Sequence, residues 1–117
     1  MNIQEFYARL GVDSETLLRR LGNEDRIRKY LGKVLEDKSF DTLTRAMLDS
    51  DYALAFLSAH TIKGTSANLE FLELNRKSSA LADALRGDTP DVASAEKLFE
   101  EVRQCYNTVI ELIMLLG

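Results

Sequence analysis

The stretch "VASAEKLFEEVRQCYNTVIELIMLLG", Val92 to Gly117, decides the fold class because its apolar residues recur at spacings of three and four. Such spacing is typical of one face of an α-helix, whereas a half-buried strand alternates. The repeating positions are Val92, Ala95, Phe99, Val102, Tyr106, Val109, Ile113 and Leu116, flanked by Leu98, Cys105 and Leu112. The stretch therefore predicts a long helix packed along a bundle seam.

The residues before this stretch predict where the long helix begins. Gly87 suits a left-handed end to the preceding helix. Thr89 is the expected N-cap, and Pro90 suits the first helical position, where no N–H partner is lost. We expect a short connection here, which makes the two helices antiparallel neighbours.

Further amphipathic segments precede it, and strand or hairpin signals are nearly absent. The apolar positions form four groups, namely a short helix through Leu21 capped by Asp13 or Ser14, Ile27 to Leu35, Phe40 to Met47, and Leu74 to Leu85. The prediction is an all-α, up-and-down antiparallel four-helix bundle with additional short N-terminal helices. We expect a single domain over 1–117, with a bundle core of about 25–117 and an N-terminal extension of about 1–22 that covers one end.

Composition excludes several classes of function. The chain has 117 residues, one His, one Cys and a net charge of −4, and its charges are interleaved. One His and one Cys cannot form a tetrahedral zinc site, and no basic stripe is present to pair with nucleic-acid phosphates. No apolar run reaches the length of a membrane span, no Gly-rich phosphate loop occurs, and a lone cysteine fits a reducing compartment.

The segment Asp51–Leu69, with Ser50 or Asp51 as its cap, is predicted to be a bundle helix with a distinct inner face. At about 100° per residue, His60 lies roughly 160° from Ile62 and so points away from the core. The inner face gathers small and apolar residues, Ala55, Ser58, Ala59, Ile62, Ser66 and Leu69.

The outer face of this helix is unusual because it lacks the charged residues expected toward solvent. Ala53, Phe56, Leu57, Gly64 and Ala67 all fall within about 60° of His60. Exposed apolar surface of this kind often marks a docking site, so Ala53, Phe56, Leu57 and Ala67 are the predicted partner-binding residues.

The chemistry of His60 and its neighbours favours a carrier over an independent enzyme. A neutral imidazole is a nucleophile, and Lys63 one turn later offers an ammonium for an anionic group. Gly64 weakens a helix by about 1 kcal/mol relative to alanine, which partner access to the imidazole would offset. The alternative is a packing glycine, which is also how we interpret Gly32. No second catalytic group stands beside His60.

The sequence "HTIKGTSANL" from His60 to Leu69 resembles the signature of histidine-containing phosphotransfer (HPt) domains, H-x-x-K-G-[ST/A]-[ST/A]-x-x-L-G. The similarity is strongest from about Leu48 to Leu69. By this resemblance His60 is the phospho-acceptor, Lys63 stabilises the phosphoryl charge, and Gly64 gives the partner access. Glu70 departs from the pattern because it stands where the family usually has glycine, which affects the local turn.

The resemblance implies a phosphorelay intermediate that carries a phosphoryl group on His60 between response-regulator receiver domains of a two-component system. Implied partners are receiver domains, a hybrid histidine kinase, or both, with no role for nucleic acid or membrane. The chain is expected to be a cytoplasmic monomer with no cofactor or metal of its own, because the receiver supplies Mg²⁺.

Two alternatives remain at the level of sequence. A non-phosphorylated helical-bundle adaptor would keep the fold without carrying phosphate, although the intact motif argues against it. The phospho-accepting domain of a chemotaxis-type histidine kinase has a similar motif but normally belongs to a much longer chain. A start at Met1 and an end in a helix favour a stand-alone protein or excised domain.

Overall fold

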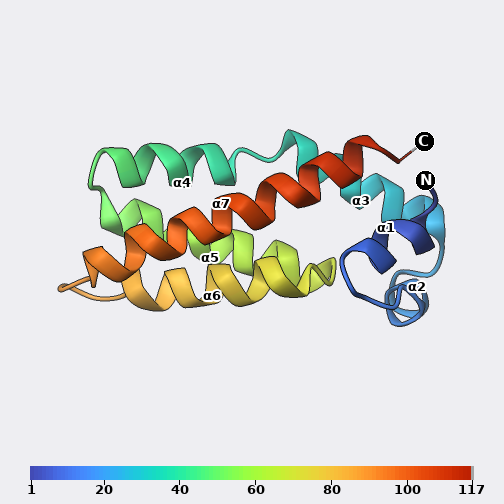
Figure 1. The fold of residues 1–117 in the computed structure, drawn as a ribbon, viewed down its shortest axis with the longest axis horizontal. Helices are drawn as coiled ribbons and strands as arrows, with labels where there is room; N and C mark the ends of the chain where they lie inside the picture. The colour runs from blue at the N-terminus through green and yellow to red at the C-terminus, as the bar shows by residue number, and fades with distance from the viewer. Residues whose placement is uncertain (117) are drawn as a thin grey trace.

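The helix predicted at the C-terminus is α7 (Val92–Met114), the longest of the helices that the computed structural model describes over residues 1–116. It follows α1 (Ile3–Arg9), α2 (Glu15–Leu21), α3 (Glu24–Glu36), α4 (Ser39–Leu48), α5 (Tyr52–Asn68) and α6 (Leu72–Leu85) (Figure 1). No strand occurs among the described residues, so the all-α prediction is confirmed. None of their helices is long and apolar enough to cross a bilayer.

The bundle consists of antiparallel rods joined by short turns, as predicted. Helix α5 packs between α4 and α6, and α6 packs between α5 and α7. Helices α3 and α4 follow one another along one edge of the bundle, and a break at Asp37 separates them (Figure 1). The Asp37 backbone is extended, and its side chain accepts a 2.6 Å hydrogen bond from the Ser39 N–H. The molecule is elongated, with extents of 43 × 21 × 19 Å.

Small residues bring α5 and α6 close together in the core. Every inner-face residue predicted for α5 is buried: Ala55, Ser58, Ala59, Ile62, Ser66 and Leu69. The buried serine hydroxyls of α5 and α6 stay satisfied because each donates to a carbonyl of its own helix, for example Ser66 Oγ to the Ile62 carbonyl at 2.7 Å and Ser78 Oγ to Leu74 at 2.6 Å. These hydrogen bonds let serine occupy a core position without a large desolvation penalty.

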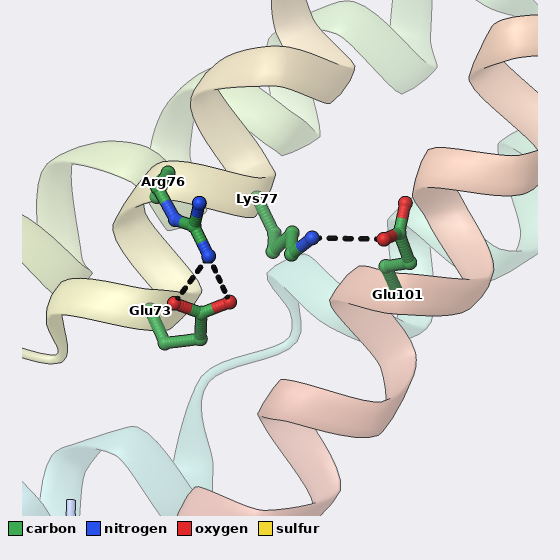
Figure 2. A network of polar contacts seen from close by, with 4 residues as sticks. All are labelled: Glu73, Arg76, Lys77 and Glu101. Carbon is green, nitrogen blue, oxygen red and sulfur yellow. Dashed lines mark hydrogen bonds and ion pairs between the residues drawn. The ribbon is translucent and has the colours of Figure 1, made fainter.

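An ion pair joins α6 to α7, and a second pair lies beside it within α6 (Figure 2). Lys77 Nζ lies 2.8 Å from Glu101 Oε1, and both side chains are partly buried. Arg76 donates to both carboxylate oxygens of Glu73 within α6. Burial, with Glu73 nearby, raises the pKa of the Cys105 thiol in this region, which keeps the thiol protonated and poorly nucleophilic.

The N-terminal helices cover the end of the bundle where α5 turns into α6 (Figure 1). Phe6 and Tyr7 of α1 are fully buried and pack against Phe71, with ring centroids 6.2 and 6.4 Å apart. Burial, and then the charge of Glu70, raises the pKa of the Tyr7 phenol. The hydrophobic core of the bundle therefore extends into α1.

The start of α7 corrects two predictions. The N-cap is Asp91, whose side chain accepts a hydrogen bond from the Ser94 N–H at 3.2 Å, so the predicted cap at Thr89 was wrong. Pro90 consequently precedes the helix, so its predicted place at the first helical position was also wrong. The physical reason is tertiary: the Asp91 N–H donates to the Ala84 carbonyl of α6 at 2.9 Å, which keeps the preceding residues in the turn. Gly87 is left-handed, as predicted, with φ of 86°.

The turn after α5 retains the geometry that glycine would favour, although Glu70 occupies it. Glu70 has φ of 57°. Its N–H donates to the Ala67 carbonyl, and the Phe71 N–H donates to Ser66 at 2.9 Å. This pair of bonds is a Schellman motif, which normally places glycine at the left-handed position. The departure from the HPt signature therefore changes the residue and not the turn.

We expect Glu70→Gly to stabilise the protein by about 1 kcal/mol, because glycine removes the left-handed strain. It also removes a buried carboxylate oxygen, Oε2, that has no hydrogen-bond partner. Thermal unfolding followed by circular dichroism measures the effect. Ser50→Gly is the matched control because Ser50 is exposed and also left-handed, with φ of 55°. A lower melting temperature for Glu70→Gly would contradict this account.

Candidate functional site

His60 lies on the exposed side of α5, as the helical wheel predicts. Its neighbours Ala59 and Ile62 are buried in the core, whereas the His60 side chain is exposed. The imidazole stacks on the ring of Phe56, one turn earlier, with centroids 6.1 Å apart and planes inclined by 23°. The lone histidine is therefore open to an approaching molecule on its outer side.

Gly64 leaves clear space beside the imidazole. The residue is exposed, and a Cβ built on it would meet no atom of the chain within 4 Å. Packing within the chain therefore does not require glycine at this position, which rules out the packing alternative. The same test shows open space at Gly32, so its interpretation as a packing glycine was wrong.

Lys63 is half-buried at the edge of the same surface, and a side chain of α6 contacts its turn of α5. Its backbone carbonyl accepts a 2.8 Å hydrogen bond from Asn75 Nδ2 and a 3.0 Å bond from Ser66 Oγ. Within residues 1–116 its ammonium group forms no salt bridge, so it remains available to an incoming anion. The sequence analysis missed Asn75, since only the pairing of α5 with α6 brings it to this turn.

The surface around His60 is apolar with a cationic rim. Of the five residues predicted to surround His60, Phe56 is half-buried, and Ala53, Leu57, Gly64 and Ala67 are exposed. Leu57 stands out, with 60% of its surface exposed. A hollow of about 240 Å³ between α4 and α5 adjoins it and is lined by residues that include Lys38, Leu57 and Thr61. An exposed apolar patch of this kind suits contact with a protein surface.

The rim includes a cation that the sequence analysis did not identify. Arg86, directly after α6, places its guanidinium carbon 5.4 Å from the centroid of the Phe56 ring. Its guanidinium also lies 3.2 Å from Asp83 Oδ1. Among residues 1–116 no group of three or more His, Cys, Asp or Glu side chains is placed to hold a metal ion.

Fold and site together define a class of protein: an antiparallel helical bundle that presents one exposed histidine, a lysine and a glycine from a single helix. Comparison with protein families gives a match to the Hpt domain over residues 13–112. The chain therefore belongs to the Hpt domain family, whose members carry out histidine phosphotransfer in two-component signalling, together with receiver domains and histidine kinases. Comparisons with curated proteins and with solved structures give no match.

Proposed function

We propose that this chain is a phosphorelay intermediate that takes a phosphoryl group from the phospho-aspartate of one receiver domain and passes it to another. The observation that supports this most directly is the exposed imidazole of His60 beside the open position at Gly64, within an Hpt domain match. A rigid helix that holds the nucleophile toward solvent suits a reaction that takes place between two proteins.

In the proposed step, the lone pair of the neutral His60 imidazole attacks phosphorus and forms an N–P bond. The P–O bond to the receiver aspartate breaks, and its electron pair leaves with the aspartate carboxylate. The proton on the other ring nitrogen then passes to water, and the reverse sequence delivers the phosphoryl group to the next receiver. The receiver contributes Mg²⁺ and the acidic pocket, and this chain contributes the nucleophile and Lys63.

The expected compartment, oligomeric state, cofactor use and partners of the chain depend on this proposal. The chain would act as a cytoplasmic monomer without a cofactor of its own. Its partners would be receiver domains, a hybrid kinase, or both, and would dock on Ala53, Phe56, Leu57 and Ala67. Cations at the rim would favour partners whose docking face is acidic.

The direct test mixes the purified protein with receivers charged by acetyl phosphate. We expect the chain to acquire a phosphate that is labile in acid and stable in alkali, as a phosphoramidate is. Acetyl phosphate without a receiver is the control, because this chain has no phosphotransfer machinery of its own in the proposal. Binding of charged receivers without any label would favour a helical-bundle adaptor and overturn the relay.

Lys63→Ala is expected to slow transfer by about ten- to a hundredfold without preventing it, because charge stabilisation assists the reaction while the nucleophile remains. Lys63→Arg should retain much of the rate, since it keeps the positive charge. Rapid-quench measurement of label on the chain gives both rates. A rate for Lys63→Ala equal to that of the unmodified protein would remove Lys63 from the mechanism.

A further inference from the structure

Three side chains form a stack along the exposed side of the bundle, from Arg86 to Phe56 to His60. The guanidinium carbon of Arg86 lies 5.4 Å from the Phe56 centroid, and the Phe56 and His60 centroids lie 6.1 Å apart. The two rings are nearly parallel, with planes inclined by 23°. The stack thus joins the end of α6 to the nucleophile on α5.

We propose that Phe56 is a positioning residue that orients the His60 imidazole for attack, and that Arg86 positions Phe56. This inference rests on the proposed function and adds the means by which the nucleophile is oriented. Docking contact and positioning are separate roles for Phe56, and they predict different kinetic changes.

Helix geometry explains why Phe56 can take this role. Side chains on a helix lean toward its N-terminus, so the residue at position 60 covers the residue one turn earlier. The imidazole makes no hydrogen bond to residues 1–116, and its described ring contact is with Phe56. Parallel offset stacking of this kind favours one ring orientation over the others.

Arg86 holds Phe56 from the other end of the stack. Helix α6 runs antiparallel to α5, so the C-terminal end of α6 lies beside the N-terminal part of α5 (Figure 1). Arg86 directly follows α6 and contacts Phe56, one turn before His60 on α5. Its contact with Asp83 at 3.2 Å favours the guanidinium conformation that covers the ring. A cation over an aromatic face is attracted by the ring's electrons. The half-buried Phe56 ring therefore contacts both a cation and the imidazole.

Orientation matters for a reaction between two proteins because the attacking nitrogen must meet phosphorus in line. Loss of an aromatic stack corresponds to about a three- to tenfold loss in the population of the favoured orientation. Leucine keeps an apolar side chain at position 56 of the docking surface but removes the ring. We therefore expect Phe56→Leu to lower the maximal transfer rate by about three- to tenfold, with a much smaller change in the receiver concentration for half-maximal rate.

The test compares single-turnover transfer over a range of receiver concentrations. Phe56→Tyr should restore the maximal rate, because it restores a ring of the same shape. Leu57→Ala is the contrasting variant: Leu57 has no ring to stack on the imidazole, and the change removes exposed apolar surface, so it should raise the half-maximal concentration and leave the maximal rate unchanged. A Phe56→Leu variant that behaves like Leu57→Ala would show docking alone and overturn the proposal.

A second measurement needs no phosphorylation. His60 is the only histidine, so its imidazole carbon-bound protons give unambiguous NMR signals. We expect Phe56→Leu to remove the ring-current shift of these signals, Arg86→Gln to reduce it, and Arg86→Lys to retain more of it. Unchanged signals in Phe56→Leu would mean that the rings do not stack in solution. If the unmodified protein takes no phosphate, the proposed function fails, while the NMR result still decides the stack.

Discussion

Replacement of His60 by glutamine is expected to abolish phosphate transfer to this chain while the helical bundle remains intact. The side-chain amide has no nucleophilic lone pair comparable with that of imidazole, so no N–P bond forms. The fold should be unaffected because His60 is exposed on α5 and its described contact is to Phe56 alone. Substitutions at such surface positions usually change stability by about 0.5 kcal/mol or less.

The measurement is the acid-labile, alkali-stable label after incubation with a charged receiver, together with a thermal melt. The unmodified protein should be labelled, and the His60→Gln variant should lack label at an unchanged melting temperature. A receiver-binding assay on the same variant separates loss of chemistry from loss of docking, and we expect binding to persist. Residual label of normal acid lability on the variant would place the phosphate elsewhere and refute the assignment of His60.

Replacement of Gly64 by glutamine is expected to slow transfer by at least about tenfold and to leave the fold as stable as before, or more so. The stability expectation follows from helix propensity, since glutamine is favoured over glycine inside a helix by somewhat less than 1 kcal/mol. It also follows from the open space around Gly64, where an added Cβ meets no atom of the chain. The transfer expectation follows because the new side chain projects into the space through which a receiver reaches His60.

Gly32→Gln is the matched control for this prediction. Gly32 is also inside a helix, α3, and an added Cβ there also meets no atom within 4 Å. It should gain helix stability without any change in transfer rate. Gly64→Ala should fall between the unmodified protein and Gly64→Gln. Equal transfer rates for Gly64→Gln and the unmodified protein would show that access to His60 does not depend on glycine.

The periodicity of single helices could be predicted from sequence with little error. The wheel for α5 placed Ala55, Ala59 and Ile62 in the core and His60 outside it, and the structure agrees. The N-cap at Asp51 was also among the predicted residues, and its side chain accepts from the Leu54 N–H at 3.2 Å. These features depend on residues a few positions apart, and about 3.6 residues per turn determine which of them share a face.

Neighbouring segments decided where helix ends fall, and here the sequence was less informative. The contact between Asp91 and the Ala84 carbonyl delays the start of α7 past Thr89. Glu70 adopts a left-handed conformation that its residue type disfavours, because the Schellman hydrogen bonds, with Phe71 packed against Phe6 and Tyr7, hold the turn. Such preferences of single residues are small enough for tertiary packing to override.

The sequence by itself determined the set of helices, the outward position of His60, and the motif that relates Lys63 and Gly64 to it. Only the tertiary structure brought Asn75 to the carbonyl of Lys63 and Arg86 to the ring of Phe56. The physical reason is the range of the interactions. Helical periodicity arises from backbone geometry within one chain segment, whereas contacts across α5 and α6 depend on how two helices pack, which no local spacing specifies.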